Sequence, residues 1–142
     1  MRLFLYCTVC SILLVQGCVT INDAELTPYI DVVRTWSADA GIEPDRGFLV
    51  YRFSEDMPEP LTLGTGFYSP VPWLIPSVIM VRKSWWDRHT ENARLLLVAH
   101  EYVHVRFDDD HVEYVDLMYK NINYALDAQA AFVVVLERHK RR

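Results

Sequence analysis

Glycine and proline are confined to the first half of this sequence, and this constrains the fold more than any other feature. All seven prolines and all five glycines of the 142-residue chain lie at or before Pro76. Because these residues punctuate regular structure, the first half predicts short elements joined by turns and the second half predicts long uninterrupted elements. Half of the residues are apolar and nearly a quarter are charged. This composition and length are typical of one globular domain.

Hydrophobic periodicity predicts which elements these are. The first half should contain a helix that starts with Thr27 as N-cap and ends at Gly41, and strands at 47–55, 61–68 and 77–86. A second helix should run from about 90 to 107, and a long C-terminal helix from about 111 to 139, antiparallel to it, with a possible break at 121–123. We therefore expect an α+β fold with an N-terminal helix, a small mixed sheet of about three strands and two further helices.

The first twenty residues are of a different kind. Arg2 precedes an apolar run, Leu3 to Val15, which has the length of a signal-peptide core and is too short to span a bilayer stably. The order Val15, Gln16, Gly17, Cys18 resembles the lipobox of bacterial lipoproteins, in which the cysteine is lipidated and becomes the new N-terminus. This resemblance implies a signal peptide at 1–17, a tether at 18–26 and a domain at 27–142. The alternatives are an ordinary secretory signal that is cut nearby, or an uncleaved apolar N-terminus.

The cysteine content and the net charge limit which disulfides and binding partners can be expected. The cysteines are Cys7, Cys10 and Cys18, so removal of the signal would leave Cys18 alone and no disulfide could form. The formal net charge of −5 gives no reason to expect a nucleic-acid partner. By resemblance to sorted lipoproteins, Val19 in place of aspartate favours the periplasmic face of the outer membrane, with the N-terminal lipid as the membrane contact.

The stretch HEYVH, residues 100–104, carries the clearest chemistry. Residues i and i+4 lie on one face of a helix, so His100 and His104 can direct two imidazoles at one ion. Neutral imidazole suits Zn²⁺, and Glu101 lies beside the first histidine, where it can act as a general base. A short pattern of this kind also arises by chance on ordinary helices. The preceding run LLLVA is too apolar for a solvated face, however, and buried histidines with an acid need partners.

HExxH on a helix is the signature of zincin metallopeptidases, and residues 77–130 resemble that class. The resemblance implies zinc-dependent hydrolysis of a protein or peptide, with Glu101 as the catalytic base and with His100 and His104 as two metal ligands. Small metzincin-like lipoprotein peptidases add a third histidine and a methionine, roles that His111 and Met118 would take. The chain departs from that pattern, because Phe107 replaces the usual glycine and His111 falls one place late.

Other candidates for the third ligand remain open. In gluzincin-type enzymes an acid from a following helix completes the site, and NYALDAQAA, residues 123–131, resembles that helix with Asp127 as the ligand. An antiparallel helix pair would also bring Glu113 or Asp116 opposite the histidines.

Substrate would be expected at an edge strand, which zincins use to bind an extended peptide. The candidate is 61–68, in which Gly64 and Gly66 permit close backbone approach, and Tyr68 or Tyr119 could donate to an oxyanion. Two alternatives to a peptidase stay open: a catalytically inactive zinc-binding envelope lipoprotein that acts through protein contacts, and a hydrolase of peptidoglycan cross-bridges.

Overall fold

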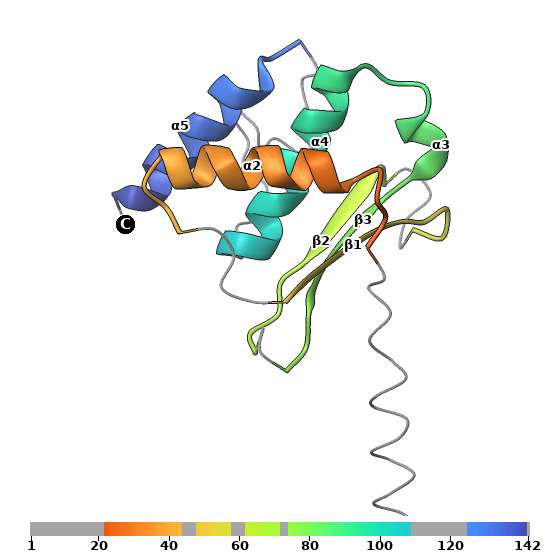
Figure 1. The fold of residues 1–142 in the computed structure, drawn as a ribbon, viewed down its shortest axis with the longest axis horizontal. Coiled ribbons are helices and arrows are strands. Elements are labelled where there is room, and N and C mark those ends of the chain that lie inside the picture. Colours follow the sequence, from red (N-terminus) through yellow and green to blue (C-terminus); the bar gives the residue numbers. More distant parts are fainter. Residues whose placement is uncertain (1–21, 44–47, 58–61, 72–73, 109–124, 142) are drawn as a thin grey trace, which may run out of the picture.

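The computed structural model describes residues 22–43, 48–57, 62–71, 74–108 and 125–141. Its elements, in chain order, are α2 (Thr27–Asp39), β1 (Leu49–Phe53), β2 (Gly64–Phe67), β3 (Ser77–Val81), α3 (Lys83–Trp86), α4 (Glu91–Phe107) and α5 (Ala128–Lys140) (Figure 1). The predicted α+β architecture, with helices and a small mixed sheet, is confirmed. The proposed signal peptide, Cys18 and the start of the tether lie outside the described residues.

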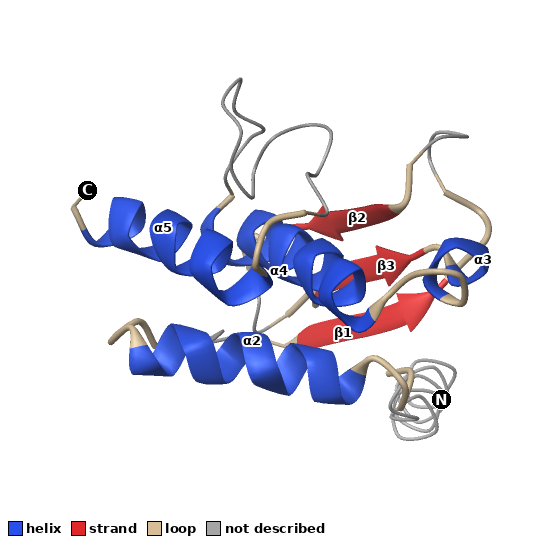
Figure 2. Cartoon of the chain, turned by 90° about the horizontal axis from the view of Figure 1, so that it is seen from above, coloured by secondary structure: helices blue, strands red, loops and turns tan. Residues whose placement is uncertain are grey.

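The three strands form one sheet in the order β1-β3-β2 (Figure 2). β1 and β3 are parallel, with Leu49 opposite Ser77, whereas β2 runs antiparallel to β3, with Gly66 opposite Ile79. Each strand falls inside one of the three predicted segments. The order places β2 at an edge, and no described strand pairs with its outer side.

The N-terminal helix α2 begins one residue earlier than predicted. Its N-cap is Leu26, while the hydroxyl of Thr27 donates to the carbonyl of Asp23 at 3.5 Å instead of capping the helix. The predicted C-terminus is confirmed: Gly41 has a φ of 74°, and the N–H of Ile42 donates to the carbonyl of Ser37. This is a left-handed helix end, which glycine adopts without strain.

The third strand is shorter than predicted, because it ends at Val81 and gives way to the short helix α3. This turn buries Trp86 completely, with its ring edge-on to Tyr29 of α2 at 4.7 Å and to Phe53 of β1 at 5.4 Å. The indole N–H of Trp86 donates to Glu25 at 2.8 Å. The tryptophan therefore joins the first helix to the sheet, as an aromatic side chain with one polar end can do.

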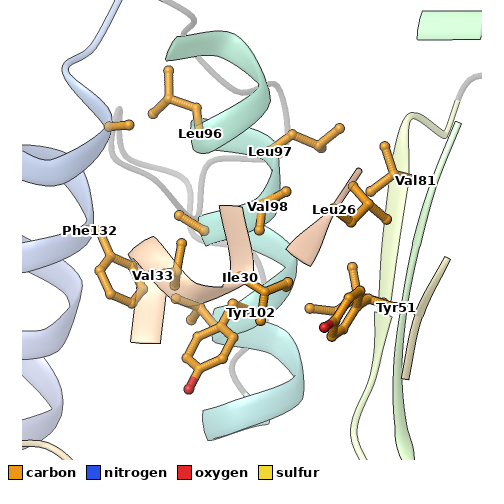
Figure 3. Close-up of a cluster of buried hydrophobic side chains, with 14 of the residues drawn as sticks. Leu26, Ile30, Val33, Tyr51, Val81, Leu96, Leu97, Val98, Tyr102 and Phe132 are labelled. Atoms are coloured by element: carbon orange, nitrogen blue, oxygen red, sulfur yellow. The ribbon is translucent and has the colours of Figure 1, made fainter. Parts of the chain in front are cut away.

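Helix α4 is the centre of the fold, since it contacts β2 and β3 on one side and α2 and α5 on the other. The close-up of the core shows Leu96, Leu97, Val98 and Tyr102 of α4 among side chains of α2, α5 and the sheet (Figure 3). Among these, Leu96, Val98 and Tyr102 are fully buried, as are Ile30 and Phe132. The helix that carries HEYVH is thus held by packing along most of its length.

Helix α5 corrects two expectations for the C-terminal half. It begins at Ala128, and residues 125–127 before it are not helical. The predicted helix from 111 to 139 is therefore interrupted at these residues. It is also parallel to α4, not antiparallel. The side chain of Asn92, at the start of α4, bonds to Leu126 O and Ala128 N, whereas the rings of Phe107 and His139 stack at the other ends of the two helices, 4.0 Å apart. Within the described part of the chain, no helix is long and apolar enough to cross a membrane.

Candidate metal centre

The histidine pair depends on the regular geometry of α4. Thr90 caps the helix through a hydrogen bond from the N–H of Ala93 at 3.4 Å, and ten of its residues are buried. The helix therefore holds His100 and His104 one turn apart on one face, as their spacing predicts. Their Nε2 atoms lie 3.1 Å apart, and their rings are nearly perpendicular, at 84°.

This separation fits two ligands of one ion. Imidazole nitrogens bound to tetrahedral zinc at about 2.0–2.1 Å lie about 3.3 Å from each other. The observed 3.1 Å between Nε2 atoms differs from this by a few tenths of an ångström. In the absence of an ion the same contact is a hydrogen bond between the two rings. A small rotation of either ring would therefore bring the two nitrogens to the separation found in a zinc site.

Glu101 is buried against the edge strand. Only 4% of the residue is exposed, and a methyl group at Gly64 would lie 2.6 Å from its Oε1 atom. At Gly66 a methyl group would lie 2.6 Å from the backbone oxygen of Glu101 and 2.9 Å from Cβ of His104. The strand can approach the helix this closely only because both positions lack a side chain.

The same burial sets the charge state of Glu101. Desolvation raises the pKa of its carboxyl to about 8, and a hydrogen bond with the backbone of Gly66 opposes this shift. The cause is the cost of removing a carboxylate from water, and the Gly66 bond offsets only part of that cost. A carboxyl with a pKa near neutrality can both accept and release a proton at physiological pH.

The third-ligand candidates divide into two groups. His111, Glu113 and Asp116 lie outside the described residues, as do Met118 and Tyr119. Asp127 is described: it is the N-cap of α5, it is exposed, and its Oδ1 accepts from the N–H of Ala130 at 2.8 Å. No group of three histidine, cysteine or acidic side chains that could hold a metal ion occurs among the described residues, so Asp127 does not complete a site with the histidine pair there.

His89 and His139, the other two histidines of the described residues, are packed on aromatic rings. His89 stacks on Trp85 at 4.0 Å, and its Nδ1 lies 2.7 Å from the Trp85 carbonyl oxygen. His139 stacks on Phe107. Both rings are half-buried. Neither belongs to the centre formed by His100 and His104.

Gly64 and Gly66 allow the close contact between β2 and α4. The approach of a bound peptide to this strand stays a prediction, and in the structure the two glycines face Glu101 and His104 of α4 at close range. Their spacing was the available signal, because residues i and i+2 of a strand share one face. The expected oxyanion donor Tyr68 follows β2 directly and is exposed.

Comparison with protein-family models, with characterised proteins and with solved structures finds no significant match for this chain.

Proposed function

We propose that this protein is a small zinc-dependent metallopeptidase of zincin type, exported and anchored by a lipid on Cys18 in a bacterial envelope. The observation that carries the proposal is the convergence of His100 and His104, whose Nε2 atoms are 3.1 Å apart on a helix packed into the core. This distance suits one tetrahedral ion. His100, His104 and His111 would hold Zn²⁺.

Glu101 would be the general base of the reaction. It follows His100 directly and it is buried. The pKa of about 8 belongs to the metal-free protein, and the charge of a bound Zn²⁺ would lower it and leave the carboxyl ionised. A bound Zn²⁺ would supply Lewis acidity to the attacking water and to the scissile carbonyl. Glu101 would take the proton of that water and return it to the leaving amine. The hydrogen bond with the Gly66 backbone would hold the carboxyl in place during both transfers.

The edge strand supports a peptide as substrate. β2 lies at the end of the strand order and contacts α4 directly at Glu101 and His104. An extended peptide that added to its outer side would gain backbone hydrogen bonds next to the proposed zinc site.

The test of the metal site is the zinc content of the purified protein, measured by elemental analysis. We expect one equivalent in the wild type and none in His104→Ala or His111→Ala, while His89→Ala, a histidine outside the site, keeps its zinc. Retention of zinc in His111→Ala would indicate that the third ligand is an acidic residue. A wild-type protein that binds no zinc would refute the proposal.

The test of hydrolysis uses Glu101→Gln, which should keep zinc and lose cleavage of an unfolded protein substrate. Purified peptidoglycan serves as the second substrate, and cleavage of peptidoglycan but not of the unfolded protein would identify a cross-bridge hydrolase. Zinc binding without hydrolysis of either substrate would identify an inactive zinc lipoprotein that acts through protein contacts.

A further inference from the structure

The two glycines of β2 differ in what lies against them. The nearest atoms to a methyl group at Gly66 would be the backbone oxygen of Glu101, Cβ of His104 and Cγ1 of Val105. The three nearest atoms to a methyl group at Gly64 would all belong to the side chain of Glu101: Oε1 at 2.6 Å, Cγ at 2.9 Å and Cδ at 3.0 Å. The space that a side chain would take at Gly64 is therefore filled by the carboxyl arm of Glu101.

The hydrogen bonds between β2 and β3 show on which side of the strand this carboxyl lies. The N–H of Arg82 donates to the carbonyl of Leu63 at 2.8 Å. The register places Gly64 opposite Val81, one step further along the pair. In an antiparallel pair, residues that bond to the neighbouring strand alternate with residues whose backbone groups point away from it. Leu63 bonds to the neighbouring strand, so the N–H and carbonyl groups of Gly64 and Gly66 point to the outer side of β2.

Glu101 occupies this outer side at Gly66. The backbone of Gly66 is hydrogen-bonded to its carboxyl, and β3 offers the Gly66 N–H no partner, because that group points away from it. The carboxyl is thus held in two ways: the Gly66 N–H donates to it, and the missing side chain at Gly64 leaves room for the arm that brings it there. Figure 2 shows β2 at the edge of the sheet, so the carboxyl lies at the edge where we propose that a peptide binds.

The two positions should respond differently to a methyl group. At Gly66 the added group would meet backbone, so the strand or the helix would have to move. At Gly64 it would meet the end of a side chain, which yields more easily than backbone. The carboxyl of Glu101 would then swing away from the Gly66 N–H while β2 stays in its place. Overpacking of this kind acts on the geometry of one group before it acts on the fold.

We propose that Gly64 is a positioning residue for the general base: its lack of a side chain lets the carboxyl of Glu101 reach the N–H of Gly66 and sets the direction in which the carboxyl points. This rests on the proposed function, since it assigns a purpose to the position of a base, and it extends the site from α4 to the edge strand. Gly66, in contrast, allows the close packing of strand and helix.

The first measurement follows the amide of Gly66 by NMR in the full-length, metal-free protein, with isotope labelling of glycine alone. The chain has five glycines, so the spectrum is simple, and the signal that disappears in Gly66→Ala belongs to Gly66. The rate of amide hydrogen exchange with solvent is measured for Gly66. Gly41 serves as the reference, because its N–H donates to the carbonyl of Ala38 at 2.8 Å, away from the site.

We expect exchange at Gly66 to be about fivefold faster in Gly64→Ala than in the wild type, the effect of losing one hydrogen bond of ordinary strength. Exchange at Gly41 should not change. Glu101→Ala should give the same increase at Gly66, because no carboxyl is left to accept the bond. Adding Gly64→Ala to Glu101→Ala should then have no further effect, since the two changes act on one contact.

The second measurement is hydrolysis of an unfolded protein by the zinc-loaded variants. Gly64→Ala should keep its zinc and its KM and lose about a hundredfold in kcat, because a shift of a catalytic group by about 1 Å has an effect of this size. The matched control is Gly41→Ala, the same change at a glycine with a φ of 74° and no atom within 4 Å of the added methyl group. It should lower the melting temperature through backbone strain and leave kcat and the Gly66 exchange rate unchanged.

Several results would overturn the proposal. Wild-type exchange and wild-type kcat in Gly64→Ala would show that the methyl group fits without moving the carboxyl. A loss of zinc in Gly64→Ala, or an equal fall in kcat in Gly41→Ala, would make Gly64 a structural residue. A further rise in exchange when Gly64→Ala is added to Glu101→Ala would indicate that the strand itself moves. A wild type without hydrolysis would remove the base and this proposal with it, even where the metal-free exchange rates show the contact, so the two failures are distinguishable.

Discussion

Replacement of Glu101 by glutamine should change how the stability of the metal-free protein depends on pH. Burial raises the pKa of Glu101 to about 8, compared with an ordinary value of 4.5. Between these two pH values the folded protein holds a proton on this carboxyl that the unfolded chain has lost. The free energy of unfolding therefore falls as the pH rises through this window, by about 1.4 kcal/mol per pH unit.

The stability that this proton contributes is fully present below pH 4.5 and is lost by about pH 8. Over the whole window the loss is on the order of 5 kcal/mol, which is comparable to the total stability of many domains. Glutamine has the shape of the protonated acid and does not titrate. Glu101→Gln should therefore have about the wild-type stability at pH 4.5 and be more stable by several kcal/mol at pH 8.

The assay is urea unfolding of both proteins in EDTA at pH 5, 6, 7 and 8. Other titrating groups are common to the two proteins and cancel in the difference between their free energies of unfolding. The control is Glu91→Gln, the same chemical change at an exposed position of the same helix. A difference between Glu101→Gln and wild type that stays constant with pH, or reverses in sign, would refute the burial argument.

Further substitutions test the packing around the site, with urea unfolding as the measurement unless another is given. Gly66→Ala should cost about 1–3 kcal/mol, because its methyl group would lie 2.6 Å from the backbone oxygen of Glu101; wild-type stability would show that the strand can move away from the helix. Asp127→Ala should cost about 1 kcal/mol through loss of the α5 cap without lowering the zinc content, and loss of zinc would make Asp127 a ligand. Phe132→Ala should cost about 3–5 kcal/mol, since the ring is fully buried, and a cost below 1 kcal/mol would contradict its place in the core. Zinc at a hundred times its dissociation constant should stabilise the wild type by about 2.7 kcal/mol and should not stabilise His104→Ala. The measurement is the rise in melting temperature relative to the protein in EDTA. Equal rises in the two proteins would show that zinc does not bind at the histidine pair.

Local patterns predicted most of the elements of this fold. Thr90 lies before an apolar helical run and caps it, and Gly41 ends α2 in the conformation that favours glycine. The end of β3 was missed, because no glycine or proline follows Val81 to mark the turn and because Trp85 and Trp86 are of a residue type that is common in strands. The direction of α5 depends on Asn92 bonding across to residues 126 and 128, a tertiary contact that leaves no periodic signal.

The candidate site was predictable to the extent that it lies on one helix. The spacing of His100 and His104 determines their convergence, since helical geometry relates residues four apart. The burial of Glu101 depends on a strand about 35 residues earlier in the chain, and only the close approach of Gly64 and Gly66 reveals it. A third ligand would come from beyond α4, and its place depends on how the chain turns after the helix, which periodicity within a helix does not determine.

The parallel arrangement of α4 and α5 also brings like helix ends together. The C-terminal end of each helix carries a partial negative charge of about half an electron, and the stacked rings of Phe107 and His139 join these two ends. The last turns hold Arg106 on α4 and Arg138 and Lys140 on α5. The basic end of the chain is therefore a counter-charge for two helix dipoles at once. One of those dipoles ends in the turn that contains His104, so shortening the tail would weaken the helix end on which the proposed metal site depends.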